Sequence, residues 1–255
     1  MHDGRVNEIE LAGGGINTVV QVGETVRRPV SPWTPATREL IEVLHAAGVP
    51  VPRWHGIDDQ GREILDFLPG EIGHYPLSDD VRSEAALVSA ARELRRFHDA
   101  AMPLLGRDLP WQLPALPDAE VVVHGDYAPY NLVFTGDQVT GIIDLDYARP
   151  GPRSYDIAYA LYRFAPLTVT DEGWGSLRER RARVRLFCDV YGLDASERRD
   201  AVGTVVPRLR GMVTYMREAA AAGNEAFARH IAEGHDAQYE CDAAYVVEHL
   251  AELGA

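Results

Sequence analysis

The sequence is poor in cysteine, contains no lysine and has no long apolar run. Its 255 residues include only two cysteines, Cys188 and Cys241, which lack the spacing of a metal site and are expected to be reduced thiols. No apolar run approaches the roughly 20 residues that span a bilayer, and the polar, acidic start of the chain does not resemble a signal peptide. We therefore expect a cytoplasmic protein.

Positive charge is also scarce, since 25 basic residues, all arginine, stand against 39 acidic ones and give a formal net charge of −14. Nucleic acids and anionic membranes require a basic surface, so neither is expected as a partner. The acidic balance permits a cationic ligand, but a solvated acidic surface has the same composition. The length is sufficient for one large domain or two lobes with a proper core, and we expect a monomer or homodimer.

The patterning divides the chain into two parts. Residues 1–70 show short apolar runs broken by turns, which predict an antiparallel meander with one helix over 34–48. From Ser78 the apolar period becomes helical, and helices are predicted over 78–97, 154–165, 176–192, 195–222 and 224–253. The predicted fold is α+β: a small antiparallel sheet lobe with one helix over residues 1–70, and a larger, mainly helical lobe over 71–255. Small ligands usually bind between such lobes.

Acidic and amide side chains gather around one predicted hairpin, in "HGDYAPYNLVF" (124–134) and "GIIDLDYA" (141–148). Hairpin pairing brings Asp144 beside Asn131, and their oxygens suit Mg²⁺ completed by substrate phosphates. Asp126 is set apart from this pair and is a candidate acceptor for the proton of an attacking hydroxyl. His124 is a further catalytic candidate, although bracing the loop is the role that we expect of it. These are the parts that phosphoryl transfer needs.

Together with "SYDIAYALY" (154–162), these segments resemble the aminoglycoside phosphotransferase and choline-kinase-like family, which has a two-lobed protein-kinase-like fold. The likeness is strong over 120–162, moderate over 11–70 and weak in the C-terminal helices. It implies that Asp126 is the catalytic base in a catalytic loop at 124–131. It also implies that Asn131 and Asp144 are magnesium ligands, with Asp146 as a second acidic residue in a metal-binding segment at 142–147. Asp156 would brace the catalytic loop.

The resemblance also implies a nucleotide site in the first lobe. The loop "AGGGIN", with Gly13, Gly14, Gly15 and Asn17, would cover the phosphates. Arg27 stands where the family has a lysine, and Glu39, with Glu42 as the alternative, is expected to pair with it. The backbone of Asp66, Phe67 and Leu68, in a hinge near 66–70, would hydrogen-bond the nucleobase. These contacts do not distinguish ATP from GTP.

The predicted function is therefore a Mg²⁺-dependent kinase that phosphorylates a hydroxyl of a small molecule. Several acidic and aromatic residues of the C-terminal part would suit a cationic acceptor, such as an aminoglycoside or a choline-like amine. They are Asp171, Glu172, Trp174, Tyr215, Glu233, Asp236, Tyr239, Glu240 and Asp242. Two alternatives stay open. One is a nucleotide-binding module with little turnover, of a pseudokinase or toxin-immunity type, and the other is a metal-dependent phosphohydrolase.

Overall fold

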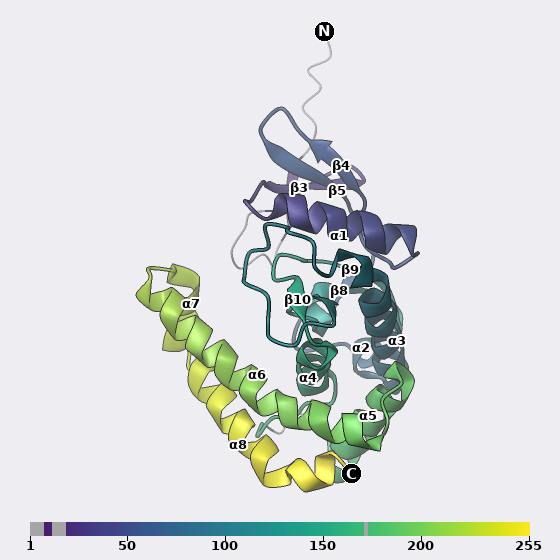
Figure 1. The fold of residues 1–255 in the computed structure, drawn as a ribbon, viewed down its shortest axis with the longest axis vertical. Helices are drawn as coiled ribbons and strands as arrows, with labels where there is room; N and C mark the ends of the chain where they lie inside the picture. Colours follow the sequence, from purple (N-terminus) through teal and green to yellow (C-terminus); the bar gives the residue numbers. More distant parts are fainter. Residues whose placement is uncertain (1–7, 12–18, 171–172) are drawn as a thin grey trace.

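The computed structural model describes residues 8–11, 19–170 and 173–255. Its first part is a five-stranded antiparallel sheet in the order β1-β2-β3-β5-β4, with one helix, α1, that lies below the sheet in the view of Figure 1. The bounds are β1 Glu8–Glu10, β2 Val20–Val22, β3 Thr25–Pro29, α1 Thr34–Ala46, β4 Trp54–Ile57 and β5 Arg62–Asp66.

The pairing of β3 with β5 decides which side chains of the sheet face inward. Val26 lies opposite Leu65, and Arg28 lies opposite Glu63. Cross-strand partners share a face of the sheet, and this face packs on the interior, since Leu65 and Glu63 are both buried. The inner face of the sheet therefore contains the ion pair between Arg28 and Glu63.

Two small sheets connect the first part to the helices. The first has the order β6-β8-β9, formed by β6 Glu71–Ile72, β8 Leu132–Thr135 and β9 Gln138–Ile142. The second pairs β7 Val121–Val123 with β10 Arg149–Gly151. Gly70 precedes β6 at a φ of +149°, and a side chain there would collide with the Phe134 carbonyl of β8. The chain that leaves the first sheet is thus packed directly against the hairpin of the second part.

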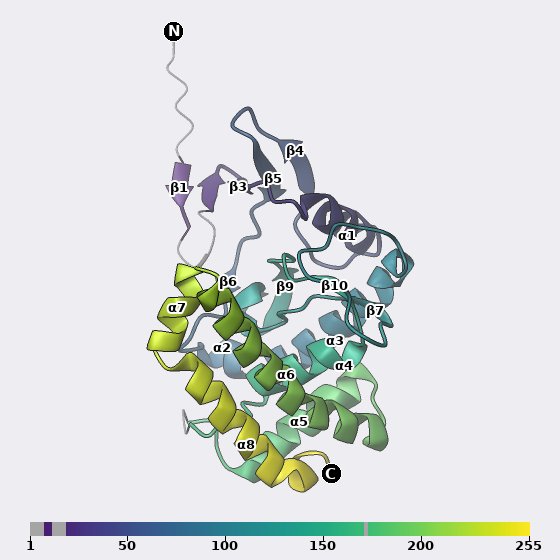
Figure 2. The same cartoon turned by 60° about the vertical axis from the view of Figure 1, so that its left-hand side comes forward.

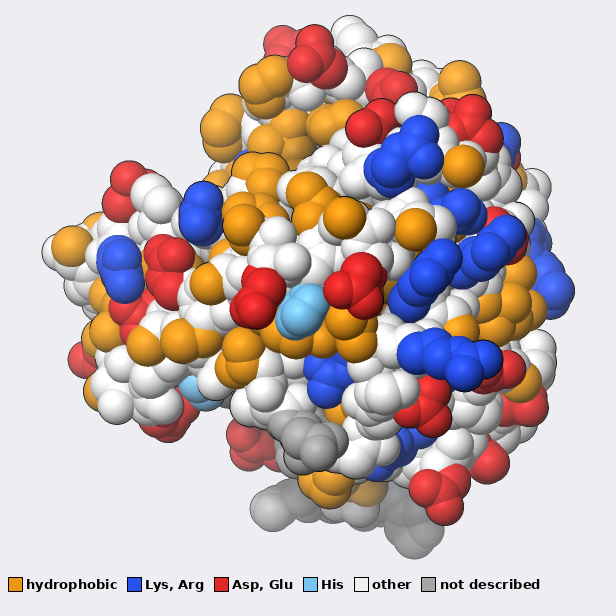
Figure 3. All heavy atoms as spheres, turned by 90° about the horizontal axis from the view of Figure 1, so that it is seen from below, with side chains coloured by type: hydrophobic (Ala, Val, Ile, Leu, Met, Phe, Trp, Pro, Cys, Tyr) orange, Lys and Arg blue, Asp and Glu red, His pale blue; other side chains and the backbone are white. Residues whose placement is uncertain are grey.

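The remainder is helical, and its helices surround the small sheets (Figures 1 and 2). The α-helices are α2 Asp79–Arg82, α3 Glu84–Ala101, α4 Arg153–Phe164, α5 Leu177–Tyr191, α6 Ala195–Ala221, α7 Glu225–Ala232 and α8 His235–Leu253. Short 3-10 turns occur at η1 Met102–Leu104 and η2 Pro129–Asn131. Among the described residues, no helix is both long enough and apolar enough to span a bilayer. Seen from below, the helical part shows arginine side chains gathered on one side with acidic side chains near them (Figure 3).

The predicted fold class is confirmed: an antiparallel sheet lobe with one helix precedes a larger, mainly helical lobe. Two helix predictions are wrong. The helix expected over 78–97 is interrupted at Ser83, whose extended backbone caps a new helix by accepting from the Ala86 amide. The helix expected over 224–253 is interrupted at Gly234, which has a φ of +85° that breaks the helical path.

Candidate functional site

The loop between β7 and β8 holds Asp126 in a defined orientation. Its carboxylate oxygen Oδ2 accepts from Nδ2 of Asn131 at 2.9 Å, and Oδ1 accepts from the Tyr130 hydroxyl at 2.9 Å. The same Asn131 amide donates to the Asp126 carbonyl, also at 2.9 Å. Asp126 stays half-buried, so two donors fix it while solvent still reaches it. A fixed and accessible carboxylate is what a proton acceptor requires.

Asp144 follows β9 and lies next to Asn131, where hairpin pairing was expected to bring it. The amide of Ile143 donates to the Asn131 carbonyl at 3.0 Å, and Asp144 comes directly after it. Asp144 is exposed, with a φ of +59°, a left-handed conformation that is uncommon for a residue with a side chain and occurs often at functional sites. Crowding by protein atoms, and then the charge of Asp146, raise the pKa of the Asp144 carboxyl, while Arg28 opposes them.

The oxygen donors here fit a magnesium ion. Because the Asn131 amide nitrogen is directed at Asp126, its Oδ1 is left facing away and accepts from no described residue. An amide oxygen and the carboxylate of Asp144 are ligands that Mg²⁺ takes, with water and phosphate oxygens completing the shell. Among the described residues no three His, Cys, Asp or Glu side chains gather as a metal site, so the protein alone does not form a closed cage.

His124 is fully buried, and both of its ring nitrogens have partners. Nε2 donates to the Ile143 carbonyl at 3.0 Å, and Nδ1 accepts from the Asp126 amide at 3.2 Å. These partners assign one neutral tautomer and leave neither nitrogen for a substrate. His124 therefore braces the loop against the segment that carries Asp144, which is the role expected of it.

Asp156, at the first turn of α4, binds the start of the catalytic loop. It accepts from the amides of His124 at 2.6 Å and Gly125 at 2.8 Å, and from Nε2 of His98 at 3.0 Å. Burial alone would raise its pKa, but the hydrogen bond and charge of His98, together with the Gly125 amide, hold the pKa of Asp156 below its ordinary value. The bracing position that the resemblance implied is the one that Asp156 occupies.

A close approach of backbone to backbone fixes the loop at Gly125. This residue has a φ of +86°, and a side chain on it would collide with the carbonyl of Tyr147. Its own carbonyl accepts from the guanidinium of Arg208 on α6 at 2.8 Å, and Arg208 is itself buried against the ring of Tyr159. Sequence reasoning missed Arg208, because nothing in its own segment indicates that it reaches a loop 83 residues away.

The predicted ion pair between Arg27 and Glu39 is wrong. The Arg27 guanidinium lies 3.6 Å from Asp58, and Glu39 pairs with Arg107 at 2.5 Å. Arg27 and Arg28 are neighbours on β3, so their side chains leave opposite faces of the sheet. The inner face is that of Arg28, so Arg28 and not Arg27 points toward the rest of the molecule.

Arg28 is the cation that joins the sheet to the metal-binding segment. Its Nε lies 2.7 Å from Glu63 on β5, and its Nη1 lies 3.0 Å from Asp146. Burial works against the charge of Arg28, but Asp146 and then Glu63 raise its pKa above the ordinary value. Asp146 thus already has a cationic partner, so Asn131 and Asp144 form the magnesium donor set that fits better.

A pocket of about 380 Å³ lies at the predicted hinge, lined by Gln21, Gly23, Glu24, Asp66, Phe67, Leu68 and Pro69. The three residues expected to contact the nucleobase are among these. The Phe67 amide donates to the Glu24 carbonyl at 2.9 Å, and the Asp66 amide to the Arg53 carbonyl at 3.0 Å. Of the three amides, only that of Leu68 has no partner in the described part of the chain, which makes it the available donor. The glycine-loop candidates Gly13, Gly14, Gly15 and Asn17 lie outside the described residues.

The described acidic residues that were expected to suit a cationic acceptor have partners within the protein. Asp236 pairs with Arg217 at 2.8 Å. Asp242 is fully buried and accepts four hydrogen bonds, from Tyr162, Thr168, Gln238 and the Val169 amide. The candidates at 171–172 lie outside the described residues. Glu233 lies 3.7 Å from His235, and Glu240 lies 3.8 Å from Arg210.

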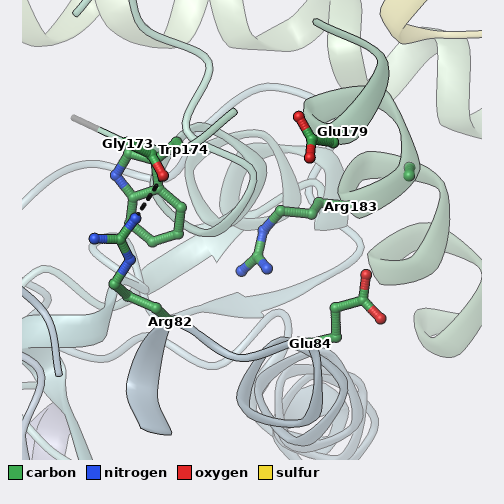
Figure 4. A pocket seen from close by; sticks show the side chains of 7 residues that line it. Arg82, Glu84, Gly173, Trp174, Glu179 and Arg183 are labelled. Atoms are coloured by element: carbon green, nitrogen blue, oxygen red, sulfur yellow. Dashed lines mark hydrogen bonds between the residues drawn. The ribbon is translucent and has the colours of Figure 1, made fainter. Parts of the chain in front are cut away.

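A second pocket, of about 280 Å³, lies in the helical part and is lined by Arg82, Glu84, Gly173, Trp174, Glu179, Ala182 and Arg183 (Figure 4). Arg82 donates to the Gly173 carbonyl at 2.8 Å, and its guanidinium lies 4.3 Å from the centre of the Trp174 ring. None of the predicted catalytic, metal or nucleotide residues lines this pocket. It is therefore separate from the site built on Asp126.

Comparison with known proteins identifies relatives of this chain. A model of the phosphotransferase enzyme family matches residues 105–196, which contain Asp126, Asn131 and Asp144. The trifolitoxin immunity protein of Rhizobium leguminosarum bv. trifolii is 34% identical over 206 residues, covering 75% of this chain and 77% of that protein.

Two solved structures show the same fold at low identity. A choline/ethanolamine kinase family protein from Mesorhizobium loti superposes with a TM-score of 0.59 at 16% identity, over 94% of this chain and 92% of that one. An aminoglycoside phosphotransferase from Streptomyces rimosus, in complex with ADP and streptomycin, gives a TM-score of 0.54 at 18% identity, over 78% of this chain and 91% of that one. The predictions of a protein-kinase-like fold and of a phosphotransferase are confirmed, and the chain belongs to the phosphotransferase enzyme family.

Proposed function

We propose that the protein is a kinase that transfers the γ-phosphate of ATP or GTP to a hydroxyl of a small molecule. The observation that carries the proposal is the position of Asn131 between two acids. Its side-chain amide donates to Asp126, and its carbonyl accepts from the amide of Ile143, the residue before Asp144. Base and metal ligands then meet at one point, with the hinge pocket available for a nucleobase. The solved relative that binds ADP supports a nucleotide co-substrate.

The residues divide the work of transfer among them. Asp126 accepts the proton of the acceptor hydroxyl as its oxygen bonds to the γ-phosphorus and the bond to the departing nucleoside diphosphate breaks. Asn131 and Asp144 would hold Mg²⁺, which when bound neutralises charge on the phosphates. Arg28, on the inner face of the sheet, is the cation that would contact a phosphate oxygen, through the nitrogen that neither Glu63 nor Asp146 engages. The Leu68 amide donates to the nucleobase.

Arg28, rather than Arg27, is expected to support nucleotide binding. Removing Arg28 alone would leave Glu63 buried without a cation, so the informative variant is Arg28→Met combined with Glu63→Gln. A charge-assisted hydrogen bond contributes about 1.5–3 kcal/mol, so this variant should bind Mg²⁺–ATP about 10–100-fold more weakly by calorimetric titration. Arg27→Met is the matched control on the same strand. Equal losses in both variants would contradict the assignment of the inner face to Arg28.

The proposed function is tested by an acceptor screen that measures ADP or GDP release against amines, aminoglycosides, sugars and hydroxy acids. Acceptor-dependent release that requires Mg²⁺ supports the kinase. Nucleotide binding without turnover across the whole panel would favour the binding module instead. Phosphoester hydrolysis in the absence of any nucleotide would favour the phosphohydrolase.

Immunity to a toxin is a second candidate function, carried by the 34% identity to the trifolitoxin immunity protein. It is compatible with kinase activity and is tested separately. Expression of this chain in a trifolitoxin-sensitive strain should protect the cells if the function is shared. Protection that persists with Asp126→Asn would show that immunity does not depend on phosphoryl transfer.

A further inference from the structure

We propose that the acceptor of this kinase carries a carboxylate, which binds to Arg163 while the acceptor hydroxyl lies on Asp126. The substrate class is then a small hydroxy acid or hydroxylated amino acid, rather than a purely cationic amine. This inference rests on the proposed function and concerns the acceptor side of the same site.

Arg163 is a half-buried cation with no anionic partner in the part of the chain that the structure describes. It lies on α4, one helical turn beyond Tyr159, and its guanidinium is 4.5 Å from the ring centre of Tyr75, 5.4 Å from Tyr130 and 5.5 Å from Tyr162. No described carboxylate lies within ion-pair distance of it, and its buried Nε has no hydrogen-bond partner. Aromatic faces offset part of the cost of withdrawing a cation from water, but they supply no hydrogen-bond acceptor for its N–H groups.

One tyrosine connects this cation to the catalytic base. The Tyr130 hydroxyl donates to Oδ1 of Asp126 at 2.9 Å and lies 2.7 Å from the Tyr159 hydroxyl, while its ring faces Arg163. Base and guanidinium are thus separated by about the length of one tyrosine side chain. A small molecule with a hydroxyl at one end and a carboxylate at the other spans such a distance.

The two oxygens of Asp126 also indicate on which side the acceptor lies. Oδ2 faces Asn131 and therefore the magnesium and phosphate side, whereas Oδ1 faces Tyr130. An acceptor hydroxyl that approaches the base from outside the phosphate site meets Oδ1. The same approach places the remainder of the acceptor over Tyr130 and toward Arg163.

The surroundings of Arg163 favour a ligand that carries a negative charge. The rings that face its guanidinium are those of the neutral Tyr75, Tyr130 and Tyr162, which supply no negative charge. Asp242, the acid that contacts Tyr162, is fully buried and saturated by four donors, so it does not serve as a counter-ion. A ligand carboxylate would complete the ion pair with a bidentate geometry that guanidinium favours. A polycationic acceptor would instead meet an unneutralised positive charge.

The test uses acceptor pairs that differ only by the carboxylate: L-serine with ethanolamine, L-homoserine with 3-amino-1-propanol, and D-glycerate with ethylene glycol. With the wild-type chain, we expect kcat/KM for ADP release to be at least tenfold higher for the carboxylate member of a reactive pair. Arg163→Met should raise KM for that member about 10–100-fold and abolish the preference. Arg163→Lys should restore part of it, because the charge is retained. Arg178→Met, at an exposed arginine of α5, is the control.

Two results would overturn the proposal. One is equal reaction of both members of every reactive pair, and the other is an unchanged KM for the carboxylate acceptor in Arg163→Met. Failure of the kinase function itself looks different, because the wild-type chain then releases no ADP with any acceptor. In that case the same pairs are titrated calorimetrically: carboxylate-dependent binding that Arg163→Met removes supports the anion site, and its absence in the wild type refutes it.

Discussion

Replacing Asp126 with asparagine is expected to lower phosphoryl transfer by about 10²–10⁴-fold while nucleotide binding remains near the wild-type value. The substitution preserves the size of the side chain but removes its capacity to accept a proton. It also places an amide where Tyr130 and Asn131 both donate, so at most one of these hydrogen bonds retains an acceptor. The measurement is acceptor-dependent ADP release at saturating nucleotide, together with a calorimetric titration of Mg²⁺–ATP.

The control for this variant is Asp108→Asn, which removes a carboxylate from an exposed loop. It should leave both transfer and binding unchanged. Transfer at the wild-type rate in Asp126→Asn would show that another group takes the proton. A parallel loss of nucleotide binding would instead assign Asp126 to the nucleotide site. The two outcomes separate a base from a binding residue.

The catalytic turn could be predicted from the sequence because its geometry is local. Asn131 and Asp144 flank one hairpin, and antiparallel pairing brings residues on either side of a short turn together. The same holds for α1, whose apolar stripe is continuous and ends at a glycine and a proline. The breaks at Ser83 and Gly234 do have local signals, a serine cap and a left-handed glycine. The apolar periodicity continues across both positions, so it predicted one uninterrupted helix in each case.

The positions of the arginine side chains at the site could not be predicted, because strand pairing and long-range packing determine them. Arg27 and Arg28 are chemically identical neighbours, and only the pairing of β3 with β5 determines which one faces Glu63. Arg163 and Arg208 read as ordinary helical arginines in their own segments. They acquire their positions from tyrosines and a glycine carbonyl supplied by other elements. Local pattern thus brought Asp126, Asn131 and Asp144 together, and long-range packing determined where the arginine side chains lie.

Replacing Asp156 with asparagine is expected to cost about 3–5 kcal/mol of folding stability at neutral pH, because it removes one partner of a fully buried and charged network. The carboxylate accepts from two loop amides and from His98, and asparagine offers a single acceptor oxygen. Denaturant unfolding monitored by circular dichroism measures the difference between variant and wild type. Asp108→Asn, at an exposed position, should show no change.

The pH dependence of this difference distinguishes a charged brace from simple packing. The folded protein holds the pKa of Asp156 below its unfolded value of about 3.9, so the carboxylate contributes its full stability above that pH. The contribution is lost as the pH falls through the folded-state pKa. The stability difference between wild type and Asp156→Asn should therefore be constant from pH 7 to about pH 5 and shrink below about pH 4. A difference that stays the same down to pH 3 would mean that the loop is held by the shape of the side chain and not by its charge.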